Sequence, residues 1–245
     1  MPAARYFADS RAPRYSLLFA LPLLLAYELA ARLLMHPGTP DVRNGADVML
    51  KSLFVWLGGR DGLLVFALVL AAVGLWFVVR DWRRHPGPLR AAVFGGMLGE
   101  SVVLAILVGV LVRGVTAAVL QHVPLMMPDA RGLSTSTQLM ISLGAGIYEE
   151  LLFRVIIVGS LAALCIRTLG MSTRGAGALA ATVGALIFSA FHYIGPYGDH
   201  LELASFLFRF FAGIVFSVLF LVRGFGITAW THALYDVFVT LSAVG

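Results

Sequence analysis

Three ionisable side chains interrupt one of the most apolar regions of the sequence. Glu149, Glu150 and Arg154 lie within the stretch GIYEELLFRV at residues 146–155. A charge at mid-depth in a bilayer costs on the order of 2.5–3.5 kcal/mol even on lenient insertion scales, so such residues usually have a function or a buried partner. On an α-helix, Glu150 and Arg154 share a face, whereas Glu149 is rotated by about 100° from Glu150. The spacing predicts a Glu150–Arg154 pair and a separate Glu149 carboxylate.

The separate carboxylate suggests acid–base chemistry. Glu149 has no oppositely charged residue on its own helical face, which suits a group that takes a proton and returns it. The alternative is structural, because a Glu–Glu–Arg cluster can also hold helices together inside a membrane. This stretch alone supports both readings.

Two later stretches place histidines at helical spacing from possible partners. In IFSAFHYIG, Phe188 precedes His192 by one turn, and in WTHALYDVF, His232 and Asp236 are four residues apart. Taken singly, a membrane histidine more often packs or forms a hydrogen bond than reacts, and a His–Asp pair is as often structural as functional. Taken together, a carboxylate base and two imidazoles fit hydrolysis. Glu149 would deprotonate a water, and the histidines would position that water, stabilise the oxyanion or protonate the leaving amine.

The three motifs resemble those of the CPBP family, which contains the CAAX proteases and bacteriocin-processing membrane enzymes. EELLFR matches E-E-x-x-x-R, FSAFH matches F-x-x-x-H, and HALYD matches H-x-x-x-(N/D), in the same order on successive spans. The resemblance covers residues 138–243 and implies a glutamate-dependent intramembrane endopeptidase. It implies catalytic roles for Glu149, His192, His232 and Asp236, and supporting roles for Glu150, Arg154 and Phe188.

One position departs from part of the family. Asp236 stands where some members have asparagine, and an aspartate donates a hydrogen bond to an oxyanion only when it is protonated. The expected role of Asp236 is therefore either that donation or the orientation of His232.

A metal site is the competing interpretation of the same residues. If a metal is bound, Glu149, His192 and His232 are the expected ligands, with zinc as the candidate, and the family has been described both as metal-dependent and as metal-free. The sequence lacks H-E-x-x-H, the usual zinc protease motif. We therefore expect no metal and no other cofactor.

The composition predicts an integral membrane protein. Of the 245 residues, 60% are apolar and only 13% are charged, and the mean hydropathy is +0.90, well outside the range of ordinary soluble domains. The sequence lacks a stripe of basic residues with interleaved aromatic residues, the pattern that would indicate nucleic-acid binding. Its single cysteine, Cys165, excludes an intramolecular disulfide. The expected partners are the lipid bilayer and a membrane-anchored or lipidated peptide or protein; the sequence predicts no oligomeric state.

The apolar runs predict an all-α polytopic membrane helix bundle of about seven transmembrane helices, with six to eight possible. The whole chain, 1–245, is expected to form one membrane domain, with N-terminal spans and loops of low motif content at 1–137 and a catalytic core at 138–243. Residues 46–58 predict a short interfacial or re-entrant helix. The expected spans are 15–35, 62–80, 91–112, 138–166 (tilted or broken), 177–195, 203–222 and 225–243.

Charges outside the three motifs predict orientation and local pairing. Most of the Lys and Arg residues that flank the spans lie on the side of the N-terminus, which favours a cytoplasmic N-terminus. The expected location is the inner membrane of a bacterium. Glu28 and Arg32, at i,i+4 spacing, predict a pair on the helix surface. Glu100 is a further candidate to line the site, and Arg209 is expected to pair with an acid or reach the interface.

Two other classes of protein fit part of this pattern. Buried acids and histidines also form ion relays in proton-coupled transporters and channels, but the spans show no internal repeat. A member of the same family that has lost proteolysis would be a scaffold. Incubation with membrane peptides separates an enzyme from a scaffold, and a proteoliposome flux assay tests for transport.

Overall fold

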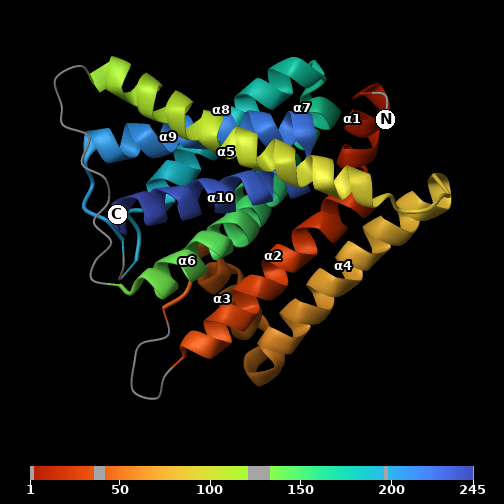
Figure 1. Cartoon of the computed structure of the whole chain (residues 1–245), viewed down its shortest axis with the longest axis horizontal. Helices are drawn as coiled ribbons and strands as arrows, with labels where there is room; N and C mark the ends of the chain where they lie inside the picture. Colours follow the sequence, from red (N-terminus) through yellow and green to blue (C-terminus); the bar gives the residue numbers. More distant parts are fainter. Residues whose placement is uncertain (1–2, 36–41, 121–132, 196–197, 245) are drawn as a thin grey trace.

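The computed structural model describes residues 3–35, 42–120, 133–195 and 198–244, and all regular structure within these ranges is helical (Figure 1). This confirms the all-α prediction. The elements are α1 (Ala3–Arg11), α2 (Pro13–Leu34), α3 (Gly45–Gly58), η1 (Gly59–Asp61), α4 (Gly62–Arg84), α5 (Ala91–Leu120), α6 (Thr135–Gly144), η2 (Ala145–Gly159), α7 (Ser160–Leu169), α8 (Thr173–Phe191), α9 (Leu203–Arg223) and α10 (Phe225–Val244).

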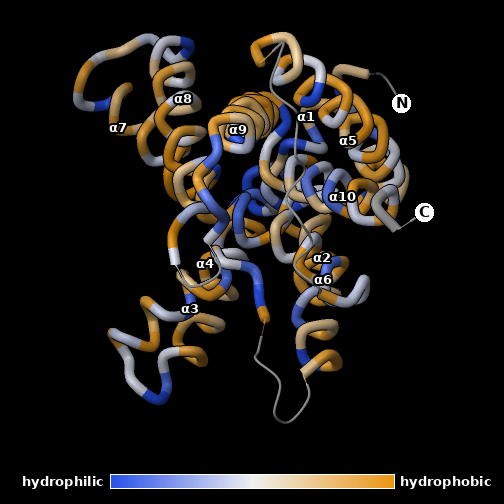
Figure 2. The backbone as a smooth tube through the Cα atoms, turned by 90° about the vertical axis from the view of Figure 1, so that its left-hand side faces the viewer, coloured by the Kyte–Doolittle hydropathy of each residue, from blue (hydrophilic) through white to orange (hydrophobic). Residues whose placement is uncertain are grey.

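Six helical stretches in the described residues are long and apolar enough to cross a membrane, which confirms a polytopic helix bundle and lies within the predicted range. Hydrophobic residues predominate along the helices (Figure 2). The expected span at 225–243 is the helix α10, but it is not among the six because it carries His232, Asp236 and several hydroxyl side chains. The six stretches are Pro13–Leu34, Gly45–Arg84, Ala91–Leu120, Thr135–Leu169, Thr173–Phe191 and Leu203–Arg223.

Helix α10 is the central helix of the bundle. It packs against α2, α5, α6, α9 and η2, and Figure 1 shows it crossing the middle of the molecule. Its first half is mostly buried, including Ile227, Ala229 and His232. A helix surrounded by protein can carry polar side chains that would be costly on a lipid-facing helix, so α10 is suited to present them to its neighbours.

The segment predicted as a short helix at 46–58 is α3, which reverses direction at η1 and packs back on α4. The turn is tight: a Cβ atom at Gly62 would lie 2.4 Å from the carbonyl oxygen of Phe54. Asn44 starts α3 by accepting a hydrogen bond from the backbone N–H of Ala46 at 2.9 Å, which is a standard N-cap. The helical prediction is confirmed, and the depth of α3 in a membrane stays a prediction.

The long segment expected at 138–166 is continuous but not uniform. It begins as α6, becomes the π-helix η2 over Ala145–Gly159, and ends as α7. A π-helix forms i→i+5 hydrogen bonds in place of i→i+4, and such turns are frequent at functional sites. The EELLFR motif lies wholly within η2, so its side chains do not follow the α-helical angles assumed from the sequence.

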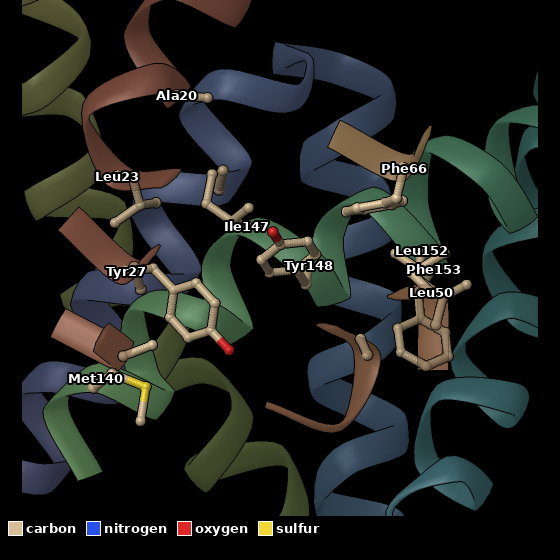
Figure 3. Close-up of a cluster of buried hydrophobic side chains, with 14 of the residues drawn as sticks. Ala20, Leu23, Tyr27, Leu50, Phe66, Met140, Ile147, Tyr148, Leu152 and Phe153 are labelled. Atoms are coloured by element: carbon tan, nitrogen blue, oxygen red, sulfur yellow. The ribbon is translucent and has the colours of Figure 1, made fainter. Parts of the chain in front are cut away.

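A buried apolar cluster joins α2, α3, η2 and α10 (Figure 3). At its centre the rings of Tyr27 and Tyr148 meet edge to face with centroids 5.4 Å apart. Leu23 and Ile147 are buried beside them. The N-terminal helices therefore share a core with the segment that carries the first motif.

The helices η2 and α10 approach each other closely at Gly146. A Cβ atom there would lie 2.4 Å from the carbonyl oxygen of Ala229 and 2.6 Å from the Cβ of Ala233. Only glycine allows this contact. The contact places η2 and α10, which carry the first and third motifs, against each other.

We therefore expect Gly146→Ala to lower the melting temperature of the detergent-solubilised protein, because overpacking at a close contact typically costs about 1–3 kcal/mol. The matched control is Gly114→Ala on α5, where an added Cβ would meet nothing within 4 Å. The control should melt at or slightly above the wild-type temperature, since alanine favours the helix. Equal melting temperatures for both variants would show that the η2–α10 contact does not depend on Gly146.

Candidate active site

The Glu150 carboxylate is the centre of a buried charge cluster. Its side chain is fully buried. The Nε of Arg154 lies 3.2 Å from Oε2, and the Nδ1 of His232 lies 2.7 Å from Oε1. The predicted Glu150–Arg154 pair is thus present, and His232 on α10 joins it. One carboxylate therefore connects η2 to α10 through charge-assisted contacts.

Two aromatic rings cover the Arg154 guanidinium. Its central carbon lies 4.4 Å from the ring centroid of Phe188 and 5.7 Å from that of Phe216, within the range of cation–π attraction. Phe216 also stacks on the imidazole of His232, with centroids 4.4 Å apart. Phe188, predicted as a supporting residue, is therefore placed against the charge cluster. Phe216 was not predicted, because nothing in its local sequence separates it from the other phenylalanines of α9.

His232 lies between two carboxylates. Its Nδ1 faces Glu150, and its Nε2 lies 3.6 Å from Oδ2 of Asp236. With carboxylate oxygens on both sides, the orientation of the imidazole ring is constrained. The separation of 3.6 Å is longer than a hydrogen bond, so both roles expected for Asp236 stay predictions.

Among the residues that the structure describes, Glu149 forms no ion pair with the members of this cluster. Its side chain is buried, and Oε1 accepts a hydrogen bond of 2.8 Å from Nδ2 of Asn44. The charges of His192, His232 and Arg154 all act on this carboxylate. The three motifs are therefore brought to one region, where η2, α8 and α10 meet. Asn44 was not among the predicted residues, and its only sequence signal is an N-cap residue before an apolar helical run.

His192 follows the last residue of α8 and has a defined ring orientation. Its Nδ1 lies 2.8 Å from the backbone carbonyl oxygen of Phe188. A carbonyl only accepts hydrogen bonds, so Nδ1 carries the hydrogen and donates it. In the neutral ring Nε2 is then the nitrogen with the free lone pair, which can accept a hydrogen bond from a water.

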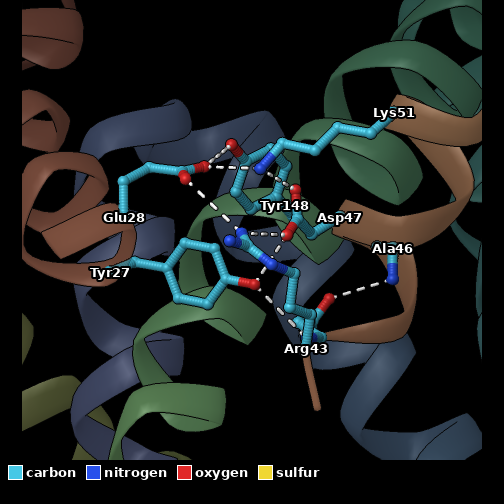
Figure 4. A network of polar contacts seen from close by, with 8 residues as sticks. Tyr27, Glu28, Arg43, Ala46, Asp47, Lys51 and Tyr148 are labelled. Atoms are coloured by element: carbon cyan, nitrogen blue, oxygen red, sulfur yellow. Dashed lines mark hydrogen bonds and ion pairs between the residues drawn. The ribbon is translucent and has the colours of Figure 1, made fainter. Parts of the chain in front are cut away.

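Glu28, Glu100 and Arg209, the charges singled out beyond the three motifs, each have partners of their own. Glu28 is bound by Lys51 at 2.7 Å and by the Tyr148 hydroxyl at 2.5 Å (Figure 4), so the predicted pairing with Arg32 is wrong. The i,i+4 rule fails here because α3 brings a cation from another helix.

Glu100 and Arg209 are also paired. The Nε of Arg223 lies 2.5 Å from Oε1 of Glu100, whose Oε2 accepts a hydrogen bond of 2.6 Å from the Tyr6 hydroxyl. Glu100 therefore ties α5 to α9 and α1 and does not line the candidate site. Arg209 pairs with Asp199, in line with the expectation that it finds an acid.

The arrangement does not present a metal site in the described part of the chain. No three His, Cys, Asp or Glu side chains within it are grouped so that they could hold a metal ion. Glu149, His192 and His232, the alternative ligand set, are among the described residues. Metal independence of the reaction stays a prediction.

One comparison with known proteins bears on this geometry. Residues 132–238 match the family model described as type II CAAX prenyl endopeptidase Rce1-like. The resemblance predicted from the motifs is thereby confirmed. The matched residues, called the Rce1-like segment, contain EELLFR, FSAFH and HALYD, and α1 to α5 lie outside them. The match supports the general activity of an intramembrane endopeptidase. Searches of curated proteins and of solved structures found no match.

The charge cluster of the Rce1-like segment predicts different effects for its two adjacent acids. Glu150→Gln should lower the melting temperature, because it leaves Arg154 buried without its counter-charge, and breaking a buried pair typically costs about 3–5 kcal/mol. Glu149→Gln should melt close to wild type, since Asn44 can still donate to the glutamine oxygen. Thermal unfolding of both detergent-solubilised variants checks this.

The double variant Glu150→Gln, Arg154→Met provides the control. Removal of both charges should restore part of the stability lost in Glu150→Gln. The assignment is wrong if Glu149→Gln proves to be the less stable single variant.

Proposed function

We propose that this protein hydrolyses a peptide bond of a membrane-associated peptide or protein with a water activated by Glu149. The supporting observation is the division between two adjacent acids. Arg154 and His232 form ion pairs with Glu150, whereas Glu149 is a buried carboxylate that accepts a hydrogen bond from Asn44. The charges of His192 and His232, and that of Arg154, act on it. A carboxylate placed in this way suits general base catalysis.

In the proposed reaction, the water oxygen attacks the carbonyl carbon of the scissile bond while Glu149 takes a proton from the water. The carbonyl oxygen becomes an oxyanion, which the Nε2–H of a doubly protonated His232 stabilises, since the other N–H of that ring is bound to Glu150. The C–N bond then breaks, and the proton held by Glu149 passes to the leaving amine. His192, with Nδ1 bonded to the Phe188 carbonyl, presents Nε2 to the water. His232 is held in place between Glu150 and Asp236.

A lipidated or otherwise membrane-anchored peptide is the proposed substrate class. The matched family is described as a prenyl endopeptidase, and the site is built among helices long and apolar enough to span a bilayer. Such a substrate would reach the helices from the lipid phase. A cytoplasmic N-terminus is proposed from the basic residues flanking the spans, with the inner membrane of a bacterium as the proposed location. Topology reporters fused to either end of the chain would test the orientation.

We expect Glu149→Gln to abolish cleavage of membrane-peptide substrates, because glutamine keeps the shape of the side chain but cannot take a proton from water. The matched control is Glu202→Gln, the same change at an exposed position, which should leave the rate unchanged. Cleavage is measured by mass spectrometry of peptides in detergent or proteoliposomes. A Glu149→Gln enzyme that turns over at the wild-type rate would contradict the proposed mechanism, and ion flux without cleavage would favour a transporter.

We also expect activity to survive exhaustive chelation, because the proposed base acts on water directly and needs no metal-bound hydroxide. Cleavage rates before and after dialysis against chelator are compared with the metal content of the purified protein. Stoichiometric zinc in active protein, with activity lost on its removal and restored by its return, would show that a metal activates the water.

A further inference from the structure

We propose that Asn44, which lies outside the Rce1-like segment, is a positioning residue that holds the Glu149 carboxylate for proton transfer. This inference rests on the proposed role of Glu149. Asn44 precedes α3 and is buried, and its Nδ2 donates to Oε1 of Glu149 at 2.8 Å. Among the residues that the structure describes, no other hydrogen bond to this carboxylate is formed, so the donor leaves Oε2 available to the water.

The orientation of the Asn44 amide is determined by its two partners. Its Oδ1 accepts from the backbone N–H of Ala46 at 2.9 Å, while its Nδ2 donates to Glu149. A flipped amide would set its oxygen against a carboxylate and its NH₂ against a backbone N–H, and both contacts would be repulsive. The side chain therefore has two separable functions, capping α3 through oxygen and binding Glu149 through nitrogen.

A polar network holds Asn44 in turn. Its backbone N–H donates to the Tyr27 hydroxyl at 3.3 Å, and that hydroxyl donates to Oδ2 of Asp47 at 2.7 Å. Asp47 is fully buried and is bound by Lys51 at 2.7 Å and by Arg43 at 3.3 Å (Figure 4). Asn44 is thus held by the Tyr27 hydroxyl of α2 and by the backbone N–H of Ala46 in α3. A donor with so little freedom can hold a carboxylate in one orientation.

The contact between this network and the motif segment is close. A Cβ atom at Gly144, the last residue of α6, would lie 2.6 Å from Cε2 of Tyr27 and 2.8 Å from Cβ of Asn44. The start of η2 is therefore packed directly against the two residues that carry the network to Glu149. The N-terminal helices form part of the site, although they carry no recognised motif.

The test uses substitutions that keep the cap but remove the donor. Serine and aspartate both cap helices well, yet neither presents an N–H to Glu149. We expect Asn44→Ser to keep a melting temperature near that of the wild type and the wild-type KM while kcat falls by about 10- to 100-fold, the usual cost of a misplaced catalytic group. Asn44→Asp sets a second buried carboxylate against Glu149, so its kcat should fall further and its melting temperature should fall as well.

A structural role for Asn44 makes a different prediction. In the wild type, the Ser172 hydroxyl oxygen caps α8 by accepting a hydrogen bond of 3.2 Å from the backbone N–H of Gly175. Ser172→Ala removes this N-cap and so provides a variant that is destabilised by loss of a cap alone. Its melting temperature should fall while kcat per folded molecule stays at the wild-type value. The proposal is overturned if folded Asn44→Ser retains the wild-type kcat, if both Asn44 variants lose rate only in proportion to stability, or if neither yields folded protein.

An infrared readout separates this proposal from the proposed function. The carboxylate stretching band of Glu149 is assigned by its loss in Glu149→Gln, and it should shift in Asn44→Ser because one oxygen loses its hydrogen bond. If the wild-type protein cleaves no peptide but the band still shifts in Asn44→Ser, the hydrogen bond is supported and the proposed function fails. An unshifted band would overturn the role of Asn44 whatever the activity.

Discussion

The structure depends on satisfying the charge of one carboxylate that has no access to solvent. Glu150 is fully buried, and an isolated ion in that position would be prohibitively costly. Arg154 from the same helix and His232 from α10 both approach it, so α10 must dock against η2 in one register. The rings of Phe188 and Phe216 then cover the guanidinium, which extends the same requirement to α8 and α9.

This arrangement gives two neighbouring carboxylates different surroundings. The two carboxylate oxygens of Glu150 lie against Arg154 and His232. Glu149 accepts a hydrogen bond from Asn44, and the charges of His192 and His232 act on it. The π-helical backbone of η2 determines how these adjacent side chains diverge. A carboxylate engaged by an arginine is a poor base because its charge is already neutralised, so the pairing of Glu150 is what leaves Glu149 as the candidate base.

Close backbone contacts make these polar contacts possible. In a bilayer the apolar surfaces of helices gain little by leaving lipid, so packing and polar contacts between helices carry more of the association. Gly146 lets η2 meet α10, and at Gly213 an added Cβ would lie 2.9 Å from Ala185 on α8. The small residues bring the helix axes near enough for the short side chains of His232 and Asn44 to reach their partners.

The sequence by itself determined the membrane class, the helical architecture, the three motifs and the pairing of Glu150 with Arg154, because apolar run length and i,i+4 spacing are local properties. Local spacing was not enough for Glu28, whose partners Lys51 and Tyr148 come from other helices. The tertiary structure alone decided that α10 is central and that Asn44 and Phe216 reach the motifs. These contacts join residues far apart in the chain, and their geometry depends on how the helices pack, which no short stretch of sequence encodes.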